Sequence, residues 1–174
     1  MQRVTHALIQ GREYEINTSF RVALRCSELA NNPNVDDYEK SIGVVTMLFG
    51  VDCPVCDEAL KKAEIFLTAG DGKGDETPLL DYQQDWGFIY SAFKSQYGVD
   101  LDTENLHFEQ FVDMLKSLKG QVINDVVHLR GYDLKEVKDP SQRRKIVEAQ
   151  QKVALKCVEE KPSKSAFLQA YKGG

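Results

Sequence analysis

The chain has 174 residues, of which 42% are hydrophobic and 28% charged, with 12 glycines and 5 prolines. This length and composition exclude a disordered or low-complexity protein and suffice for one compact domain with a buried core. The longest apolar run, residues 42–51, is about half of the roughly 20 residues that a membrane-spanning helix needs. The N-terminal sequence lacks the features of a signal peptide, so we expect a cytoplasmic protein that neither crosses nor binds a membrane.

The net charge of the chain is −5, from 22 basic and 27 acidic side chains. An acidic protein has no general attraction for a polyanion, which disfavours nucleic acid as a partner. The charge is uneven, because residues 1–140 have a net charge of −10 and residues 141–174 one of +5. The basic segment is either a solvated helix and tail attracted to the acidic body or a docking segment for an acidic partner. Nucleic-acid binding is a further alternative for its basic side chains, Arg143, Arg144, Lys145, Lys152 and Lys156.

Residues 4–9 and 12–16 predict two short β-strands joined by a two-residue turn. In the second run Tyr14 and Ile16 alternate with two glutamates, as in a strand with one buried face. Two strands alone are marginally stable in water, so this hairpin must pack on helices or extend through another element or subunit. The edge of the hairpin is therefore a candidate contact surface.

Three helices are predicted in the first half of the chain, from apolar side chains that recur every three or four residues. The first ends at Asn31, the second follows Asp36 and Asp37, and Pro54 is predicted to start the third. The side chains predicted to face the core are Phe20, Ala23, Leu24, Ser27 and Ala30, then Tyr38, Ile42, Val45, Leu48 and Phe49, then Ala59, Leu60, Ala63, Phe66 and Leu67. Residues 70–79 form a glycine-rich loop between two helical halves, without the Gly-Lys-Ser/Thr ending of a phosphate-binding loop.

The second half opens with the strongest helical pattern, which Asp81 and Gln84 would cap and Gly98 would end. Its aromatic stripe comprises Tyr82, Trp86, Phe93 and Tyr97, with Ile89 between them. Three further helices are predicted, from Thr103 or Asn105 to Gly120, from Val122 to Arg130, and from Ser141 to about Cys157 behind an Asp139-Pro140 cap. The last helix has few apolar positions and therefore needs a surface to pack on.

These patterns predict a mainly α fold, a multi-helix bundle with a short N-terminal β-hairpin. We assign residues 1–158 to a single helical domain, with the loop at 70–79 between its halves. Residues 159–174 are predicted to be a basic, mobile tail in which Phe167, Leu168 and Tyr171 form a small anchor.

The Cys53-Pro-Val-Cys56 sequence has the spacing of half a zinc site or of a redox dithiol. A tetrahedral zinc site needs two more ligands, and the chain has neither a second Cys-x-x-Cys pair nor a paired-histidine motif. The flanking sequence also lacks the βαβ pattern of a thioredoxin. We therefore expect ordinary thiols, no metal and no cofactor, with a thiol or metal protein as the alternative.

Several motifs together carry a resemblance to a known family. They are Tyr14-Glu-Ile-Asn-Thr-Ser-Phe-Arg21, Leu80-Asp-Tyr82, Ile89-Tyr-Ser-Ala-Phe93, Gln96-Tyr-Gly-Val-Asp-Leu101, Leu106-His-Phe108 and Leu129-Arg130. In this order the chain resembles the bacteriophage gene-product-fifteen family over residues 10–155. Members are encoded in the tail-morphogenesis modules of long-tailed phages and prophages and are viewed as tail assembly chaperones or accessory tail proteins.

The resemblance implies a non-enzymatic binding protein in the cytoplasm of the bacterial host. Its partner would be the tape-measure protein, with the tail-tube protein as a second partner and homo-oligomers as a further option. A chaperone for a long helical protein must offer apolar grooves and bind weakly at many places. The residues predicted to bind the partner are Trp86, Tyr90, Phe93, His107, Phe108 and Phe111.

These residues also have a simpler interpretation. An aromatic stripe at helical spacing normally faces the core, which applies to Trp86, Phe93 and Phe111, whereas Tyr90 and His107 fit a surface position better. A solvated or capping role suits His107 better than that of a ligand or base. At the level of function, the alternative to a chaperone is a structural tail or head-tail component that is retained in the virion.

Overall fold

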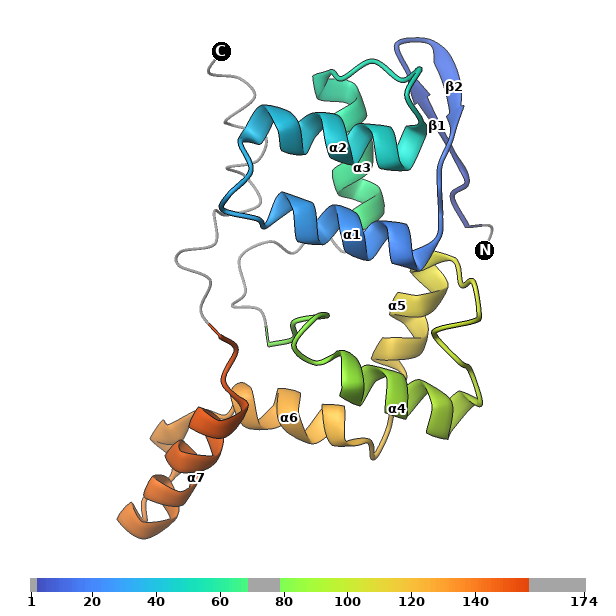
Figure 1. Ribbon diagram of the computed structural model, residues 1–174. Helices are drawn as coiled ribbons and strands as arrows, with labels where there is room; N and C mark the ends of the chain where they lie inside the picture. The colour runs from blue at the N-terminus through green and yellow to red at the C-terminus, as the bar shows by residue number, and fades with distance from the viewer. Residues whose placement is uncertain (1–2, 69–78, 157–174) are drawn as a thin grey trace. The chain divides into compact units, whose positions relative to one another are not determined.

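The computed structural model describes residues 3–68 and 79–156. Within these residues the chain forms seven α-helices and an N-terminal two-stranded antiparallel hairpin (Figure 1). The mainly α fold class predicted from the sequence is therefore confirmed. None of the described helices has the length and apolar character needed to cross a membrane.

The described residues divide into two compact units. The first unit comprises residues 3–68 and 105–113, and the second comprises residues 79–104 and 114–156. Helix α5, Phe108–Lys116, is shared between them. The predicted loop at 70–79, apart from Leu79, lies outside the described residues, and so does the predicted tail at 159–174 with its anchor of Phe167, Leu168 and Tyr171.

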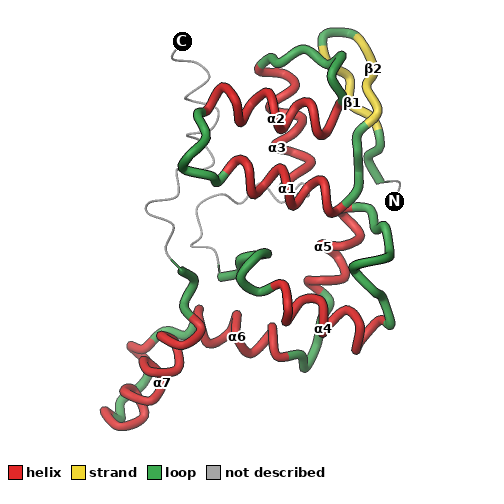
Figure 2. Tube along the Cα trace, in the orientation of Figure 1, coloured by secondary structure: helices red, strands yellow, loops and turns green. Residues whose placement is uncertain are grey.

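The predicted hairpin is present, with β1 at His6–Ile9 and β2 at Arg12–Glu15 (Figure 2). Gln10 and Gly11 form its turn with φ values of 49° and 77°. Two successive residues with positive φ give a type I′ turn, whose twist matches that of the flanking strands. The turn is also tied to a helix, because Gln10 N donates to Glu58 Oε2 over 2.8 Å.

The two faces of the hairpin differ in burial. Ala7 lies opposite Tyr14 on the buried face, whereas Leu8 lies opposite Glu13 on the exposed face. Directly opposite residues of an antiparallel pair point to the same face, so the alternation read from the sequence is retained. One face is packed and the other remains open.

Three helices complete most of the first unit: α1 Phe20–Ala30, α2 Asp37–Phe49 and α3 Asp57–Leu67. Helices α1 and α2 lie side by side (Figure 2). They approach closely at Gly43, where an added Cβ would overlap Leu29 Cδ2. The absence of a side chain at this position therefore permits the contact.

Two expectations for α2 are wrong, since Tyr38 and Ile42 are exposed rather than directed into the core. The buried face of α2 is centred on Ser41, Val44 and Leu48, which lie three or four residues apart. Ser41 tolerates burial because its hydroxyl donates to the carbonyl of Asp37 over 2.7 Å. The prediction placed only apolar residues on the buried face of α2, so it included Tyr38 and Ile42 and left out Ser41.

The same bias affects the neighbouring helices. In α1 the small thiol Cys26 is buried, whereas Ser27 and Ala30 remain partly accessible. Pro54 does not start α3, because the helix begins at Asp57 with Cys56 as its N-cap.

The second unit contains α4 Trp86–Tyr97, α6 Val122–Arg130, the 3-10 helix η1 Leu134–Glu136 and α7 Pro140–Val153. Helix α4 begins later than predicted. The Asp81 carboxylate accepts hydrogen bonds from the backbone N–H groups of Gln83 and Gln84, over 2.9 and 2.8 Å, and so forms a turn before the helix. The helix ends as predicted at Gly98, whose φ of 69° is left-handed.

Helix α5 also begins later than predicted, at Phe108. The residues before it are held in an extended backbone bridge, in which Phe20 N donates to Leu106 O over 3.0 Å and Phe108 N to Thr18 O over 2.7 Å. Backbone groups used in this bridge are not available for an earlier helical turn. All of these residues belong to the first unit.

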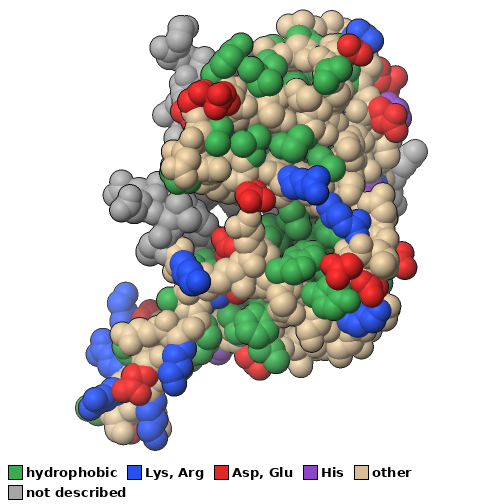
Figure 3. All heavy atoms as spheres, in the orientation of Figure 1, with side chains coloured by type: hydrophobic (Ala, Val, Ile, Leu, Met, Phe, Trp, Pro, Cys, Tyr) green, Lys and Arg blue, Asp and Glu red, His purple; other side chains and the backbone are tan. Residues whose placement is uncertain are grey.

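Helix α7 is capped as predicted but is shorter at its C-terminal end, at Val153. The Asp139 carboxylate accepts from Ser141 N over 2.9 Å, and Pro140 occupies the first turn. No residue of α7 is buried, and lysine and arginine side chains gather on it (Figure 3). It is therefore a basic helix with little apolar packing.

Candidate functional site

The candidate partner-binding residues of the second unit lie on α4. Phe93 is fully buried, with its ring edge-to-face against Tyr97 at a centroid distance of 5.7 Å. Trp86 and Tyr90 are half-buried and lie one helical turn apart. Phe93 is thus a core residue, and the accessible candidate residues on this helix are Trp86, from the stripe, and Tyr90 beside it.

A small polar cluster lies beside Tyr90. Lys94 Nζ donates to Asp100 Oδ2 over 2.9 Å, and the Asp100 carboxylate lies close enough to Tyr90 to raise the pKa of its phenol. Asp100 also accepts from the backbone N–H of Asp102 over 3.0 Å. These contacts connect α4 to the loop that follows it.

The ionisation of the cluster follows from these contacts. The pKa of Tyr90 is raised, first by partial desolvation and then by the Asp100 carboxylate. The hydrogen bond from Lys94 lowers the pKa of Asp100, and the same bond raises the pKa of Lys94. At neutral pH the phenol is neutral and the ion pair is formed, so the cluster presents an uncharged aromatic ring beside a neutralised pair.

The other three candidate residues lie in the first unit. Phe111 is fully buried and stacks on Phe20 at 4.9 Å, and Phe108 is buried with its ring 5.6 Å from that of Phe66. His107 is half-buried, and its ring lies edge-to-face with Phe66. Phe108 and Phe111 therefore belong to the core of this unit.

His107 has a structural role. Its Nε2 lies 3.2 Å from the Val4 carbonyl, and its Nδ1 accepts from Glu109 N over 3.2 Å. A carbonyl can only accept, so Nε2 carries the hydrogen and Nδ1 does not. Both ring nitrogens are used, and the imidazole caps α5 as the capping interpretation anticipates.

Exposed apolar side chains that the sequence analysis did not select lie on both units. On α4, Phe88 is 43% exposed, and in the first unit Leu8 and Ile65 are more than half exposed. Phe88 lies two residues from both Trp86 and Tyr90 and therefore faces a different side of the helix. A helical projection of α4 places Phe88 on the side opposite the stripe.

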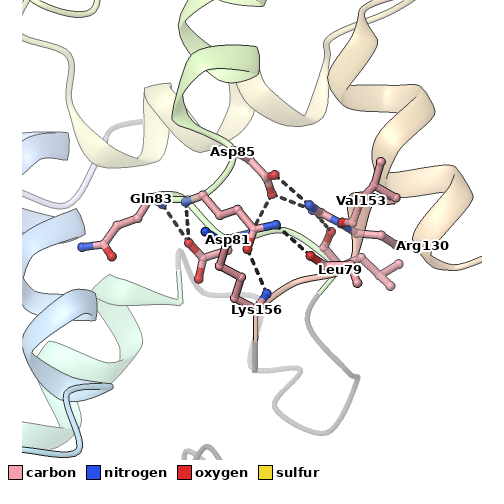
Figure 4. Close-up of polar contacts among 9 residues, drawn as sticks. Leu79, Asp81, Gln83, Asp85, Arg130, Val153 and Lys156 are labelled. Carbon is pink, nitrogen blue, oxygen red and sulfur yellow. Dashed lines mark hydrogen bonds and ion pairs between the residues drawn. The ribbon is translucent and has the colours of Figure 1, made fainter. Parts of the chain in front are cut away.

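A buried ion pair of the second unit is absent from the residues predicted as a site from the sequence. Asp85 and Arg130 form a two-pronged ion pair, with distances of 2.6 Å for Nη1–Oδ2 and 2.8 Å for Nη2–Oδ1 (Figure 4). Their side chains are 1% and 7% exposed. Arg130 also donates to the carbonyls of Leu79 and Val153, over 2.9 and 2.6 Å. Because the N–H donors of Arg130 are used within the protein, the Asp85–Arg130 pair is a structural contact rather than a ligand site.

Two glutamines extend this contact to α7. Gln150 Nε2 donates to the carbonyls of Leu129 and Tyr132, each over 3.0 Å. Gln84 Nε2 donates to Ala154 O, and Gln84 Oε1 accepts from Lys156 N, each over 2.9 Å (Figure 4). The C-terminal end of α7 is thus attached by polar contacts.

The described cysteines do not form an activated thiol pair. Burial raises the pKa of Cys26 to about 12, and burial together with the neighbouring Cys56 raises the pKa of Cys53. A raised pKa lowers the thiolate fraction and with it the nucleophilicity. Within residues 3–68 and 79–156, no three His, Cys, Asp or Glu side chains are grouped so that they could hold a metal ion.

Comparison with known proteins gives one match. The model of a family described as Bacteriophage Gp15 protein matches residues 2–155. No curated protein and no solved structure matches the chain.

Proposed function

The chain belongs to the bacteriophage Gp15 protein family, and we propose that it is a tail assembly chaperone. It binds the tape-measure protein in the cytoplasm of the host cell and releases it when the tail-tube protein polymerises around it. This is a binding function without a chemical step or a cofactor. It extends the resemblance read from the sequence motifs.

The observation that carries the proposal is the accessible aromatic surface of α4. Trp86 and Tyr90 keep part of their surface open, and Phe88 is exposed on another side of the same helix. Aromatic side chains bury a large area and lose few rotamers on binding, so they suit apolar helical partners. We assign the first contacts with the tape-measure protein to these three residues.

Weak binding is part of this assignment. Trp86 and Tyr90 form a partly covered strip, Phe88 lies on another side of the helix, and their neighbour Phe93 is buried in the core. A strip of this kind offers less buried area than a deep pocket, which favours fast release. A partner that is later enclosed by the tail tube must be released in this way.

The proposal is tested by co-expression with the tape-measure protein of the same phage. The soluble fraction of that protein should rise in the presence of the chain. Phe88→Ser and Tyr90→Ser should each lower the gain, because loss of a central aromatic contact weakens binding by roughly tenfold or more. Ile65→Ser is the matched control, since it removes an apolar side chain that is at least as exposed as Phe88 from α3 in the first unit. No gain in solubility with the unaltered chain would contradict the proposal.

The alternative, a component retained in the tail, is separated by mass spectrometry of purified virions. A chaperone should be absent from the mature particle or nearly so. Stoichiometric presence would replace the chaperone function with a structural one.

A further inference from the structure

Helix α7 presents basic side chains that have few partners. Arg143, Lys145 and Lys152 are exposed, and among the described residues none of them has an ion pair with a carboxylate. Arg144 pairs with Glu148 on the same helix, over 3.3 Å. The first turn of α7 has no acidic residue, although acidic side chains are the ones that stabilise a helix N-terminus. Of the three basic residues without an ion pair among the described residues, Lys152 lies in the last turn, where a positive charge stabilises the helix, whereas Arg143 and Lys145 lie nearer the N-terminal end, where it does not.

The packing of α7 is equally incomplete. The helix has 14 residues and none of them is buried. A helix in a globular protein gains most of its stability by burying one face. The polar contacts of Gln150 and Arg130 hold its C-terminal end and leave the face that carries Lys145 and Lys152 in solvent.

The outer face of the hairpin has a charge opposite to that of α7 and is also uncovered among the described residues. Leu8 in β1 is 57% exposed, and Val4, which precedes β1, is 52% exposed. Glu13 and Glu15 lie on the same face of β2, opposite Leu8 and His6. No other described strand pairs with this two-stranded sheet. The face is thus acidic and partly apolar.

We propose that α7 of one molecule packs on this outer hairpin face of a second copy of the chain, with Lys145 and Lys152, which share one face of the helix, facing Glu13 and Glu15. The aliphatic stems of the two lysines cover Leu8 and Val4 while the charged ends reach the two carboxylates. The helix gains a surface to pack on, and the sheet gains a covered face. This inference is independent of the tape-measure function.

The pairing joins two different surfaces, and each copy carries both. Such head-to-tail contacts generate rings if they close and chains if they do not. A second copy is favoured over nucleic acid because the same chain supplies the matching acidic surface, and its net charge of −5 repels a polyanion.

Two charge-reversed proteins test the contact. The helix variant carries Lys145→Glu and Lys152→Glu, and the hairpin variant carries Glu13→Lys and Glu15→Lys. All four side chains are exposed, so both variants should fold, which circular dichroism checks. The control carries Lys61→Glu and Lys62→Glu, which make the same change in net charge as the helix variant at exposed positions of α3.

Sedimentation equilibrium measures the association. The unaltered chain should show a weight-average mass above 19.7 kDa that rises with concentration. The association should weaken as the Debye length falls from about 10 Å at about 0.1 M salt to about 3 Å at about 1 M salt. Each reversed variant alone should associate at least about tenfold more weakly, whereas the control should not.

Mixing the two variants is the decisive step. The acidic hairpin of the helix variant meets the basic α7 of the hairpin variant, so the mixture should associate again. The proposal would be overturned if the mixture stays monomeric or if the unaltered chain is monomeric at low salt. It would also be overturned if the control associates as weakly as the helix variant. Retarded migration of DNA that only the helix variant abolishes would instead assign α7 to nucleic acid and also overturn it.

Discussion

Different kinds of contact stabilise the interior of each of the two units. In the first unit aromatic rings meet in the core, as in the stack of Phe20 on Phe111 and the contact of Phe66 with Phe108. In the second unit the buried Asp85–Arg130 pair connects three segments through carboxylate and carbonyl oxygens. Apolar contacts tolerate small displacements, whereas a buried ion pair is stabilising only with both partners in place. The second unit should therefore be far more sensitive to single polar substitutions.

The largest effect is expected from Asp85→Ala. It leaves the Arg130 guanidinium buried without its counter-charge, which costs about 3–5 kcal/mol in the free energy of unfolding. Urea denaturation followed by circular dichroism measures the loss. Arg144→Ala is the control, because the exposed pair with Glu148 contributes about 0–1 kcal/mol. Equal losses of unfolding free energy in the two variants would contradict the expected difference between the buried and the exposed ion pair.

In the first unit Phe66→Leu should have a smaller effect. The substitution keeps an apolar side chain but removes the ring contacts with Phe108 and His107. We expect a loss of about 1–2 kcal/mol, from the ring contacts and a small change in volume. The same urea denaturation measures it. A loss as large as that of Asp85→Ala would show that the first unit is no more tolerant than the second.

Glycine-to-alanine substitutions at the two ends of α4 should change the free energy of unfolding by about 1 kcal/mol each, with opposite signs. Gly98 has a φ of 69°, so Gly98→Ala should destabilise by about 1 kcal/mol. Gly87 is helical with no atom within 4 Å of an added Cβ, so Gly87→Ala should stabilise by up to about 1 kcal/mol. Thermal unfolding of both variants measures the difference. The same sign in both would refute it.

The buried thiol of Cys26 should make the free energy of unfolding depend on pH in the alkaline range, with no effect near neutral pH. The pKa of Cys26 is about 12 in the folded state, against 9.0 for the free thiol. Between these values the unfolded chain loses this proton and the folded chain keeps it, so stability falls as the pH rises. The free energy of unfolding should fall less steeply above about pH 9 in Cys26→Ala than in the unaltered chain. Parallel pH profiles would contradict the burial of a neutral thiol.

Elements with a strong apolar period could be predicted from the sequence, but their exact limits could not. The hairpin follows from alternation and a turn at Gly11, and Gly98 ends α4 as expected. The starts of α4 and α5 were missed because tertiary contacts compete with the local signals. Asp81 forms a turn, and Phe108 belongs to a backbone bridge that begins 90 residues earlier in the chain at Thr18.

The candidate site shows the same limit. Aromatic periodicity located α4 and α5, but spacing alone does not tell which side of a stripe remains accessible, as Phe93 and Tyr90 illustrate. Phe88 was missed because it lies outside the stripe. The Asp85–Arg130 pair joins residues 45 positions apart, and one sequence offers no signal that brings them together.

The central claim, that α4 binds a helical partner, has a direct spectroscopic test. Trp86 is the only tryptophan of the chain and lies half-buried on α4. Titration with tryptophan-free helical segments of the tape-measure protein should shift its fluorescence to shorter wavelength with saturation, and Phe88→Ser should weaken the affinity. An emission spectrum that stays constant with all segments across the tape-measure sequence would contradict the account.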